Sequence, residues 1–204
     1  MGHFDITETN IAIERLLDVT ENPRHRYLLA TYNRHRYLEM AGRYKEIFTP
    51  EMTVEHPVYR FSMVGRPQFK LDGRAEVEAL YQRYAKTNTC IFYAEDETLA
   101  VGDTMIASRA IIYQQAMGSS LVRLGIHADE NAVYLTKSNI AMIWPYDERG
   151  RMIGEDVWEY DDTDRDFIKL DPADVLSAEQ AAKLLEPLIK PLPPLYELSS
   201  GGRR

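Results

Sequence analysis

The chain has 204 residues, of which 45% are hydrophobic and 27% are charged, a composition typical of a folded domain with a sizeable core. Its net charge of -8 argues against a nucleic-acid or anionic-membrane partner. No apolar run reaches the length of a membrane span, the N-terminus lacks a signal-peptide pattern, and the single cysteine, Cys90, cannot form an internal disulfide. We therefore expect a cytoplasmic protein with no membrane partner.

Helical signals dominate the first 90 residues. Residues 8–17 carry apolar side chains at helical spacing. Asn22 and Pro23 predict the cap and first turn of a second helix, which continues to about residue 41 and ends at Gly42. The pattern then predicts a short helix over residues 43–48, a strand over 52–56, a loop over 59–69 and a helix over 74–85 capped by Asp72.

The second half is rich in strand signals. The β-rich runs, separated by turn residues, cover residues 90–95, 104–115, 133–144 and 152–160. Such runs in an antiparallel meander form a strongly curved sheet with helices on one face. Residues 119–131 form an insertion between two of these strands, which could serve as a lid or as an interface loop.

The composition shifts after residue 170. Ser177 and Gln180 have the spacing of a capping box at the start of a helix, and four prolines then predict an extended tail. We expect residues 1–170 to form one domain with an N-terminal helical extension, and residues 171–204 to form a C-terminal helix and proline-rich tail.

The segment Met-Thr-Val-Glu-His-Pro-Val-Tyr over residues 52–59 carries a family resemblance. It follows a helix that ends in Tyr-Lys-Glu-Ile-Phe and precedes a helix that begins at a glycine, Gly73, with a tyrosine, Tyr81, eight residues later. This order resembles the nuclear-transport-factor-2-like (NTF2-like) superfamily, which includes ketosteroid isomerase-like and SnoaL-like proteins. Over residues 23–161 the resemblance implies a cone-shaped α+β barrel: a curved antiparallel sheet packed by N-terminal helices around an apolar cavity.

The resemblance nominates His56 for acid–base catalysis. In the ketosteroid isomerases a carboxylate at this place moves the proton, and histidine suits that task because imidazole takes and gives protons near neutral pH. A histidine at a strand end that bonds a backbone carbonyl is the alternative interpretation.

Two tyrosines of the isomerases also have counterparts here. Ungapped counting places the tyrosine that bonds the substrate oxygen at Tyr32, whereas anchoring on Gly42 places it at His35, and both lie on one helix face. Tyr81 matches the second, supporting tyrosine. Ordinary packing on an apolar helix face remains the alternative for Tyr32 and Tyr81, and a solvated basic face for His35.

The last strand contributes a carboxylate. Glu155 lies in a segment that resembles the superfamily's last-strand pattern, so it could orient His56, contact a substrate hydroxyl, or form an ion pair with Arg109. Met142 replaces the aspartic acid of the steroid oxyanion hole, which argues against simple ketone isomerisation. Val157 replaces the last-strand carboxylate of the epoxide hydrolases of this fold, which argues against epoxide opening.

The sequence thus predicts a cofactor-free lyase or isomerase that binds a hydrophobic aromatic or polycyclic alcohol. The predicted catalytic residues are His56, Tyr32 and Glu155, and the predicted substrate contacts are Tyr59, Tyr81, His35, Arg109, Trp144 and Met142. No phosphate-binding loop, HExxH or CxxC motif is present, so we expect neither a cofactor nor a metal site.

Three function classes stay open. Length and tail resemble the superfamily's aromatic-dimer lyases, which expel formaldehyde from a diaryl diol to give a stilbene. The alternatives are a SnoaL-like dehydratase, isomerase or cyclase acting on a steroid or polyketide, and a non-catalytic binding or assembly module. An exposed outer sheet face and the tail predict a homo-oligomer.

Overall fold

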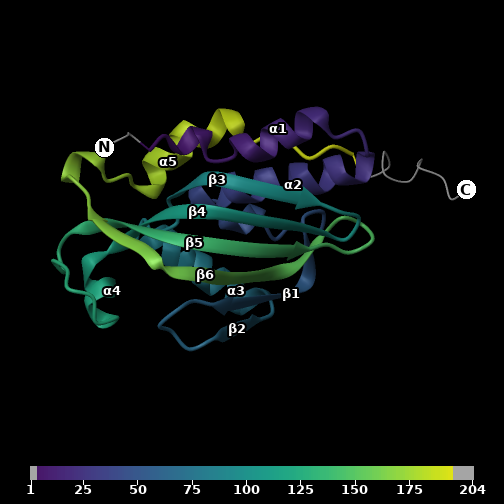
Figure 1. The fold of residues 1–204 in the computed structure, drawn as a ribbon. Coiled ribbons are helices and arrows are strands. Elements are labelled where there is room, and N and C mark those ends of the chain that lie inside the picture. Colours follow the sequence, from purple (N-terminus) through teal and green to yellow (C-terminus); the bar gives the residue numbers. More distant parts are fainter. Residues whose placement is uncertain (1–3, 195–204) are drawn as a thin grey trace, which may run out of the picture.

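The computed structural model describes residues 4–194, which form a single curved sheet and the helices that pack on it (Figure 1). The strand order is β2-β1-β6-β5-β4-β3. The strands are β1 (Thr53–Ser62), β2 (Phe69–Asp72), β3 (Phe92–Val101), β4 (Met105–Met117), β5 (Val133–Pro145) and β6 (Met152–Lys169). The helices are α1 (Ile11–Val19), α2 (Pro23–Met40), α3 (Arg74–Lys86), α4 (Gly118–Arg123) and α5 (Ala178–Leu185), and four 3-10 turns cover Ile6–Glu8, Tyr44–Glu46, Pro172–Asp174 and Glu186–Leu188.

The α+β architecture predicted from the resemblance is confirmed, with one correction to the sheet. Strands β3 to β6 form the expected antiparallel meander, but β1 pairs with β6 in parallel. The sheet is therefore mixed. Strands β2 to β5 lie between β1 and β6 in the sequence, and β6 returns beside β1 in the same direction. The sheet is also unclosed, since β2 and β3 remain as its two edges.

Irregular pairing curves the sheet around its contents. The register shifts within β1 between Thr53 and Val58 and within β3 between Glu95 and Thr98, where Asp96 has a positive φ of 51°. Bulges of this kind bend a strand and increase its twist. In Figure 1, α2 and α3 lie behind the curved sheet, α1 and α5 lie beyond its β3 side, and α4 lies at one end.

The ends of α2 follow the sequence signals. The side chain of Asn22 accepts hydrogen bonds from the backbone N–H groups of Arg24 and His25, and Pro23 occupies the first turn. Gly42 adopts φ 66° just beyond the helix, a left-handed conformation that favours glycine. The helix starts and stops as predicted because both signals are local.

Other boundaries differ from the prediction. Residues 59–62 continue β1 and residue 69 begins β2, so the predicted loop shrinks to residues 63–68. Strand β6 extends nine residues past the predicted end at Tyr160. The N-cap residue of α3 is Gly73, which has no side chain to accept a capping hydrogen bond. Asp72 ends β2 instead, and its carboxylate interacts with His56 and Lys70.

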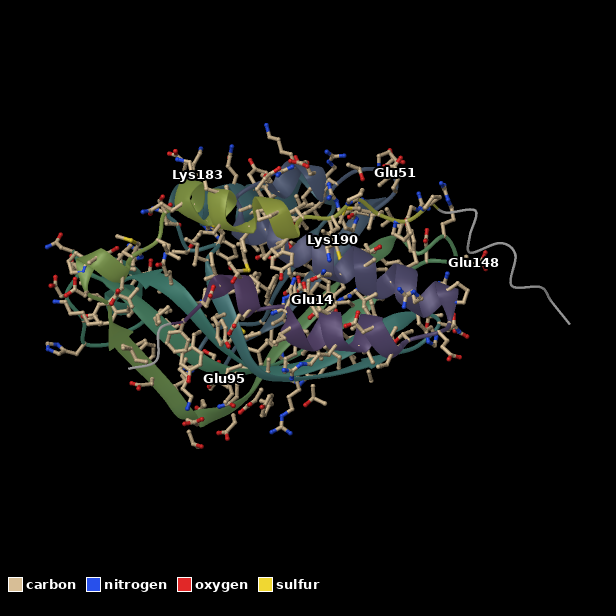
Figure 2. All side chains as sticks on the ribbon, turned by 90° about the horizontal axis from the view of Figure 1, so that it is seen from above. Glu14, Glu51, Glu95, Glu148, Lys183 and Lys190 are labelled. Atoms are coloured by element: carbon tan, nitrogen blue, oxygen red, sulfur yellow. The ribbon has the colours of Figure 1, made fainter. Side chains whose placement is uncertain are left out.

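The C-terminal helix packs on the body of the protein. Its capping box of Ser177 and Gln180 is formed, and its buried residues Ala181 and Leu185 pack in a cluster with Tyr37 of α2. Beyond α5 the chain crosses α2, where the backbone oxygen of Lys190 accepts a hydrogen bond from Arg34 (2.8 Å; Figure 2). The Ser-Ser-Gly-Gly-Arg-Arg end of the predicted tail lies outside the described residues. No helix among residues 4–194 is long and apolar enough to cross a membrane.

Candidate active site

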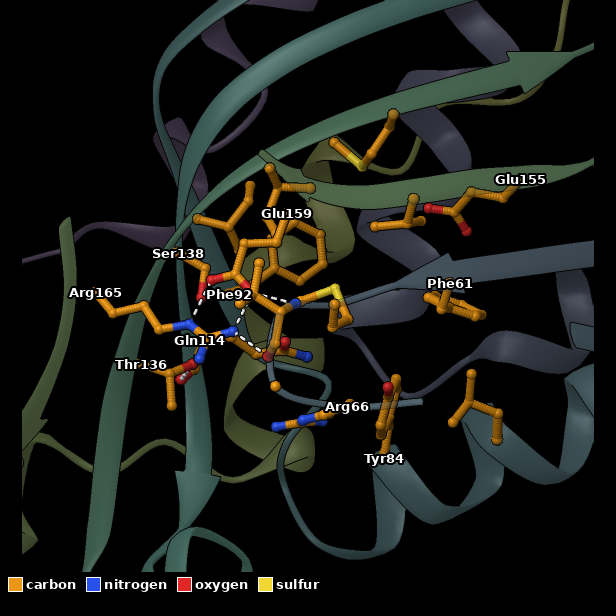
Figure 3. A pocket seen from close by; sticks show the side chains of 18 of the residues that line it. Phe61, Arg66, Tyr84, Phe92, Gln114, Thr136, Ser138, Glu155, Glu159 and Arg165 are labelled. Atoms are coloured by element: carbon orange, nitrogen blue, oxygen red, sulfur yellow. Dashed lines mark hydrogen bonds and ion pairs between the residues drawn. The ribbon is translucent and has the colours of Figure 1, made fainter. Parts of the chain in front are cut away.

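A cavity of about 350 Å³ lies between the concave face of the sheet and helices α2 and α3. This volume falls in the range of small-molecule sites. Its walls are mostly apolar and aromatic, and they include Phe61, Tyr84, Phe92, Ile140, Met142, Trp144 and Val157. Figure 3 shows the cavity from close by, with Glu155 on β6 at one end and the side chains of the mouth at the other.

Three carboxyl groups line this mostly apolar cavity, and one of them, Glu159, forms an ion pair with Arg165. The other two, Glu39 and Glu155, form no ion pair with an arginine or lysine among the described residues. Glu155 is only 8% exposed and Glu39, near the end of α2, retains 14% of its side-chain surface. Among the described residues Glu155 has no hydrogen-bond partner, and Glu39 has only the ring of His35 at 3.8 Å. Both carboxyl groups are thus buried, and a bound ligand could supply the hydrogen bonds that they lack. Buried polar groups of this kind are typical of functional sites.

Burial raises the pKa of both acids, and the charge of Glu39 adds to the shift of Glu155 alone. Burial raises the pKa of Glu39 to about 8, with a nearby Arg36 opposing the shift. Burial and the charge of Glu39 raise the pKa of Glu155 well above its usual range. Two carboxyl groups that share an apolar site do not both ionise, so one stays protonated when the other is charged.

A chain of polar side chains supports the cavity wall. The Nε2 atom of His35 lies 2.9 Å from the hydroxyl of Tyr81, and that hydroxyl lies 3.3 Å from the hydroxyl of Tyr59. Burial lowers the pKa of His35 to about 3, so its imidazole is neutral and can serve as either donor or acceptor. Tyr81 lines the cavity, whereas His35 and Tyr59 lie directly behind it.

Tyr32 belongs to a different buried group. Its hydroxyl contacts Glu97 at 3.2 Å and Ser108 at 3.3 Å, and Glu97 forms a fully buried ion pair with Arg36 at 2.7 Å. Trp144 covers Tyr32 edge-on, at 4.7 Å between ring centroids. The tyrosine therefore orders the wall of the cavity and does not border it.

His56 does not reach the cavity. Its side chain is 69% exposed and its Nε2 atom lies 2.8 Å from Asp72 at the outer edge of the sheet. Pro57, Tyr59 and Phe61 occupy the inward positions of β1. Because side chains alternate along a strand and the register of β1 shifts locally, His56 points outward. We expected His56 to face the substrate, but the structure places its side chain outside the cavity.

Arg109 is also outside the cavity. It is exposed on the outer face of β4, where its Nε donates to the hydroxyl of Tyr160 at 2.7 Å. It is neither a cavity contact nor an ion-pair partner of Glu155, so both expectations for this residue are corrected.

Of the nine predicted site residues, the structure places four on the cavity surface: Glu155, Tyr81, Trp144 and Met142. Tyr59, His35 and Tyr32 lie behind the wall. Sequence reasoning missed Glu39, the acidic partner of Glu155. A signal was present, because Tyr32, His35, Arg36 and Glu39 share one face of α2 at helical spacing.

The mouth of the cavity is formed by two segments far apart in the sequence. One is the loop over residues 63–68, which is attached to β6 because Arg165 donates to the backbone oxygen of Val64 (2.6 Å) and pairs with Glu159. The other is the insertion with α4, whose Leu121, Leu124 and Ile126 line the opening. The predicted insertion therefore borders the cavity.

No group of three His, Cys, Asp or Glu side chains that could hold a metal ion occurs within residues 4–194. The polar groups that line the cavity are three carboxyls, three guanidinium groups, two phenols and the amide and hydroxyl side chains of Gln114, Thr136 and Ser138. Such groups can bind an organic molecule and move its protons.

The curved, unclosed sheet in the order β2-β1-β6-β5-β4-β3, with helices against its concave face, is consistent with an NTF2-like fold. The parallel pairing of β1 with β6 is its one departure from the antiparallel sheet that the resemblance predicted. No protein-family model and no curated protein matches the sequence.

Several solved structures of this type are similar. They include an epoxide hydrolase/cyclase-like enzyme, SalBIII, described for pyran ring formation in the polyether salinomycin (14% identity, 72% of this chain, 98% of that chain, TM-score 0.46). Two NTF2-like proteins are also similar. One is a protein of unknown function from Cytophaga hutchinsonii (7% identity, 63% and 95% coverage, TM-score 0.40) and the other has a cystatin-like fold and comes from Novosphingobium aromaticivorans (18% identity, 79% and 94% coverage, TM-score 0.37). At this level of similarity they carry no information about the activity of this chain.

Proposed function

We propose that the protein is an acid–base enzyme that acts on a hydrophobic small molecule held in the NTF2-like cavity. The observation that supports this function most strongly is the pair Glu39 and Glu155. Two buried carboxyl groups, neither with a hydrogen-bond partner, face one apolar cavity with pKa values raised. Such a pair can supply a base and an acid to one substrate.

The pKa shifts of the two glutamates indicate which one is the base and which one is the acid. Burial raises the pKa of Glu39 to about 8, and burial together with the charge of Glu39 raises the pKa of Glu155. Once Glu39 is ionised, its charge therefore favours the protonated form of Glu155. Glu39 is therefore the base that takes a proton from the substrate. Glu155, which keeps its proton, is the acid that donates to a departing or newly charged oxygen. Tyr81, held by His35 and Tyr59, offers a phenol hydroxyl to the same oxygen or to the substrate body.

Elimination from an aromatic or polycyclic alcohol is the reaction class we favour. In the formaldehyde-releasing form, Glu39 takes the proton of a primary hydroxyl and the carbon–carbon bond breaks as formaldehyde leaves. The electron pair forms the new double bond and expels a second hydroxyl, which leaves as water with the proton of Glu155. Dehydration, isomerisation and cyclisation need the same base and acid, so a SnoaL-like dehydratase, isomerase or cyclase is the neighbouring alternative.

A purely binding role is the second candidate. An open cavity of about 350 Å³ and an unpaired Glu155 suit a bound ligand as well as a substrate. In a binding module the two carboxyl groups would pair with ligand hydroxyls and the ligand would leave unchanged.

The test separates these outcomes. The protein is incubated with a 1,2-diarylpropane-1,3-diol in ¹⁸O-labelled water, and the products are identified by mass spectrometry. An unlabelled stilbene with released formaldehyde supports the lyase. A label in the aromatic product overturns elimination in favour of hydrolysis, whereas a label in formaldehyde is uninformative because formaldehyde exchanges its oxygen with water.

A direct titration tests the acid–base pair without a substrate. Carboxyl resonances of ¹³C-labelled glutamate are followed by NMR against pH, in the wild type and in the Glu39→Gln and Glu155→Gln variants. Two resonances that titrate far above the ordinary range, each lost in one variant, support the pair. Ordinary titration of both carboxyls would overturn the catalytic assignment.

A further inference from the structure

Three arginines line the cavity, and they differ in their partners. Arg36 pairs with Glu97 at 2.7 Å, and Arg165 pairs with Glu159. Arg66 makes no side-chain hydrogen bond or ion pair with any described residue, although it lines the same cavity. It is exposed in the loop over residues 63–68, at the mouth. Its guanidinium is therefore available to a ligand.

The loop that carries Arg66 is held in place. The backbone N–H of Val64 donates to Glu159 at 3.2 Å, and the backbone N–H of Arg66 donates to the oxygen of Met63 at 3.1 Å. Gly65, with φ 74°, allows the tight turn between them. Val64 thus ties the loop to β6, and the hydrogen bond between Arg66 and Met63 closes the turn, which together limit where the Arg66 side chain can reach.

The side chain lies at the cavity opening. Figure 3 shows Arg66 alongside Tyr84 of α3, apart from Arg165, which dashed lines join to Glu159. Burial raises the pKa of Tyr84 to about 12, and the positive charge of Arg66 opposes that shift. The guanidinium is thus close enough to the phenol for their charges to interact.

The charge balance of the cavity favours an anion at this place. Arg36 and Arg165 are neutralised by their carboxylates, and burial raises the pKa values of Glu39 and Glu155, which favours their uncharged forms. Arg66 then supplies the excess charge of the cavity. This local positive charge stands out in a chain whose net charge is -8.

The rim beside Arg66 is apolar. Phe69 at the start of β2 and Leu124 after α4 both line the cavity and are 40% and 42% exposed. Apolar side chains at an opening can cover a ligand that is longer than the deep part of the cavity. The mouth thus combines apolar contact area with one free cation.

We propose that Arg66 binds a carboxylate of the ligand, so that the molecule that occupies the cavity is an aromatic or polycyclic acid. Its apolar body lies between the sheet and α3, and its carboxylate lies at the mouth. Guanidinium and carboxylate form paired, charge-assisted hydrogen bonds that fix orientation as well as affinity. This inference deepens the proposed function, since it names a substrate class for the same cavity, and it concerns binding alone.

Two dyes with the same apolar body test the inference. 1-Anilinonaphthalene-8-sulfonate carries an anionic group, and N-phenyl-1-naphthylamine lacks it. Their dissociation constants are measured by fluorescence for the wild type, Arg66→Gln and Arg60→Gln. Arg60 is a matched control, because it lies on the outer side of β1, paired with Asp156, and its removal changes the net charge equally.

We expect Arg66→Gln to raise the dissociation constant of the anionic dye by roughly five-fold and that of the neutral dye by less than two-fold. A change of this size is usual for a partly exposed charge pair. Arg60→Gln should change neither dissociation constant. Raising the salt concentration should weaken the binding of the anionic dye alone, since salt screens interactions between exposed charges. Equal losses for both dyes in Arg66→Gln, or a wild-type protein that binds the anionic dye no more tightly than the neutral one, would overturn the inference.

The result is distinguishable from a failure of the proposed function. If the dyes behave as expected but the carboxyl resonances titrate normally, the cavity binds acids and is not an acid–base catalyst. If the carboxyls titrate as expected but Arg66→Gln has no selective effect, the catalytic pair stands and the substrate class is wrong.

Discussion

Two pairs of titratable side chains differ mainly in their surroundings. His56 and Asp72 form a hydrogen-bonded pair at the exposed edge of the sheet, whereas Glu39 and Glu155 lie in the apolar cavity with no hydrogen-bond partner among the described residues. Hydrogen bonds from Lys70 and then His56 lower the pKa of Asp72, while burial raises the pKa of both glutamates. The comparison teaches that a titratable side chain becomes catalytically useful through desolvation and access to a ligand, and not through residue type alone.

The largest expected effect is loss of turnover in the buried pair. Glu39→Gln should lower kcat by about 10²–10⁴-fold on the true substrate, the usual contribution of a general base. Glu155→Gln should do the same through loss of the acid. Glu55→Gln, which makes the same chemical change on the exposed side of β1, is the control and should keep full activity. Full activity in Glu39→Gln would remove the buried pair from the mechanism.

The pH dependence of turnover sharpens the division of roles. Because Glu39 must be ionised and its pKa is about 8, kcat/KM should rise about ten-fold per pH unit between pH 5 and 7 and level off near pH 8. Stopped assays over this range measure the profile. A plateau that begins near pH 5 would show that the base has an ordinary carboxylate pKa, contrary to the assignment.

Stability should respond to pH through the same pair. The folded protein holds the Glu39 proton up to about pH 8, whereas the unfolded chain releases it near pH 4.5. In that window the folded state binds more protons, so the free energy of unfolding falls as pH rises. Urea unfolding of the wild type and Glu39→Gln at pH 5 and pH 8 measures this, and the variant should lose less stability between the two values. Identical losses in both proteins would contradict a raised Glu39 pKa.

The smallest effects are expected at the exposed pair. His56→Ala removes a hydrogen bond between two solvent-exposed side chains, and such pairs contribute little. Turnover should stay within about two-fold and the melting temperature within about 2 °C of the wild type. A large loss of turnover with unchanged stability would return His56 to the mechanism and would break the comparison.

Local signals predicted the elements well. Asn22 with Pro23, Gly42, and Ser177 with Gln180 mark helix ends in both the sequence and the structure, because capping depends on neighbours within a few residues. The meander was also predictable from its β-rich runs. The parallel pairing of β1 with β6 was not, because it joins segments about 100 residues apart and leaves no local pattern.

The site was predictable only in part. Family spacing nominated Glu155, Tyr81 and Met142, and the aromatic side chain nominated Trp144; all four line the cavity. Family spacing also nominated His56, which a register shift in β1 turns outward. It passed over Glu39. Helical spacing places Glu39 on the same face of α2 as Tyr32 and His35, but only the packing of the sheet against α2 shows that Glu39 reaches the cavity.

The sequence by itself determined an α+β chain of NTF2-like element order, with capped helices, a long meander and the residues available for acid–base work. Tertiary structure decided which of those residues meet. Burial, strand register and the partners contributed by distant segments place Glu39 and Glu155 at one apolar cavity, leave Arg66 unpaired at its mouth and turn His56 outward. These are properties of distances between remote residues, and the free energy of desolvation that sets a pKa depends on those distances.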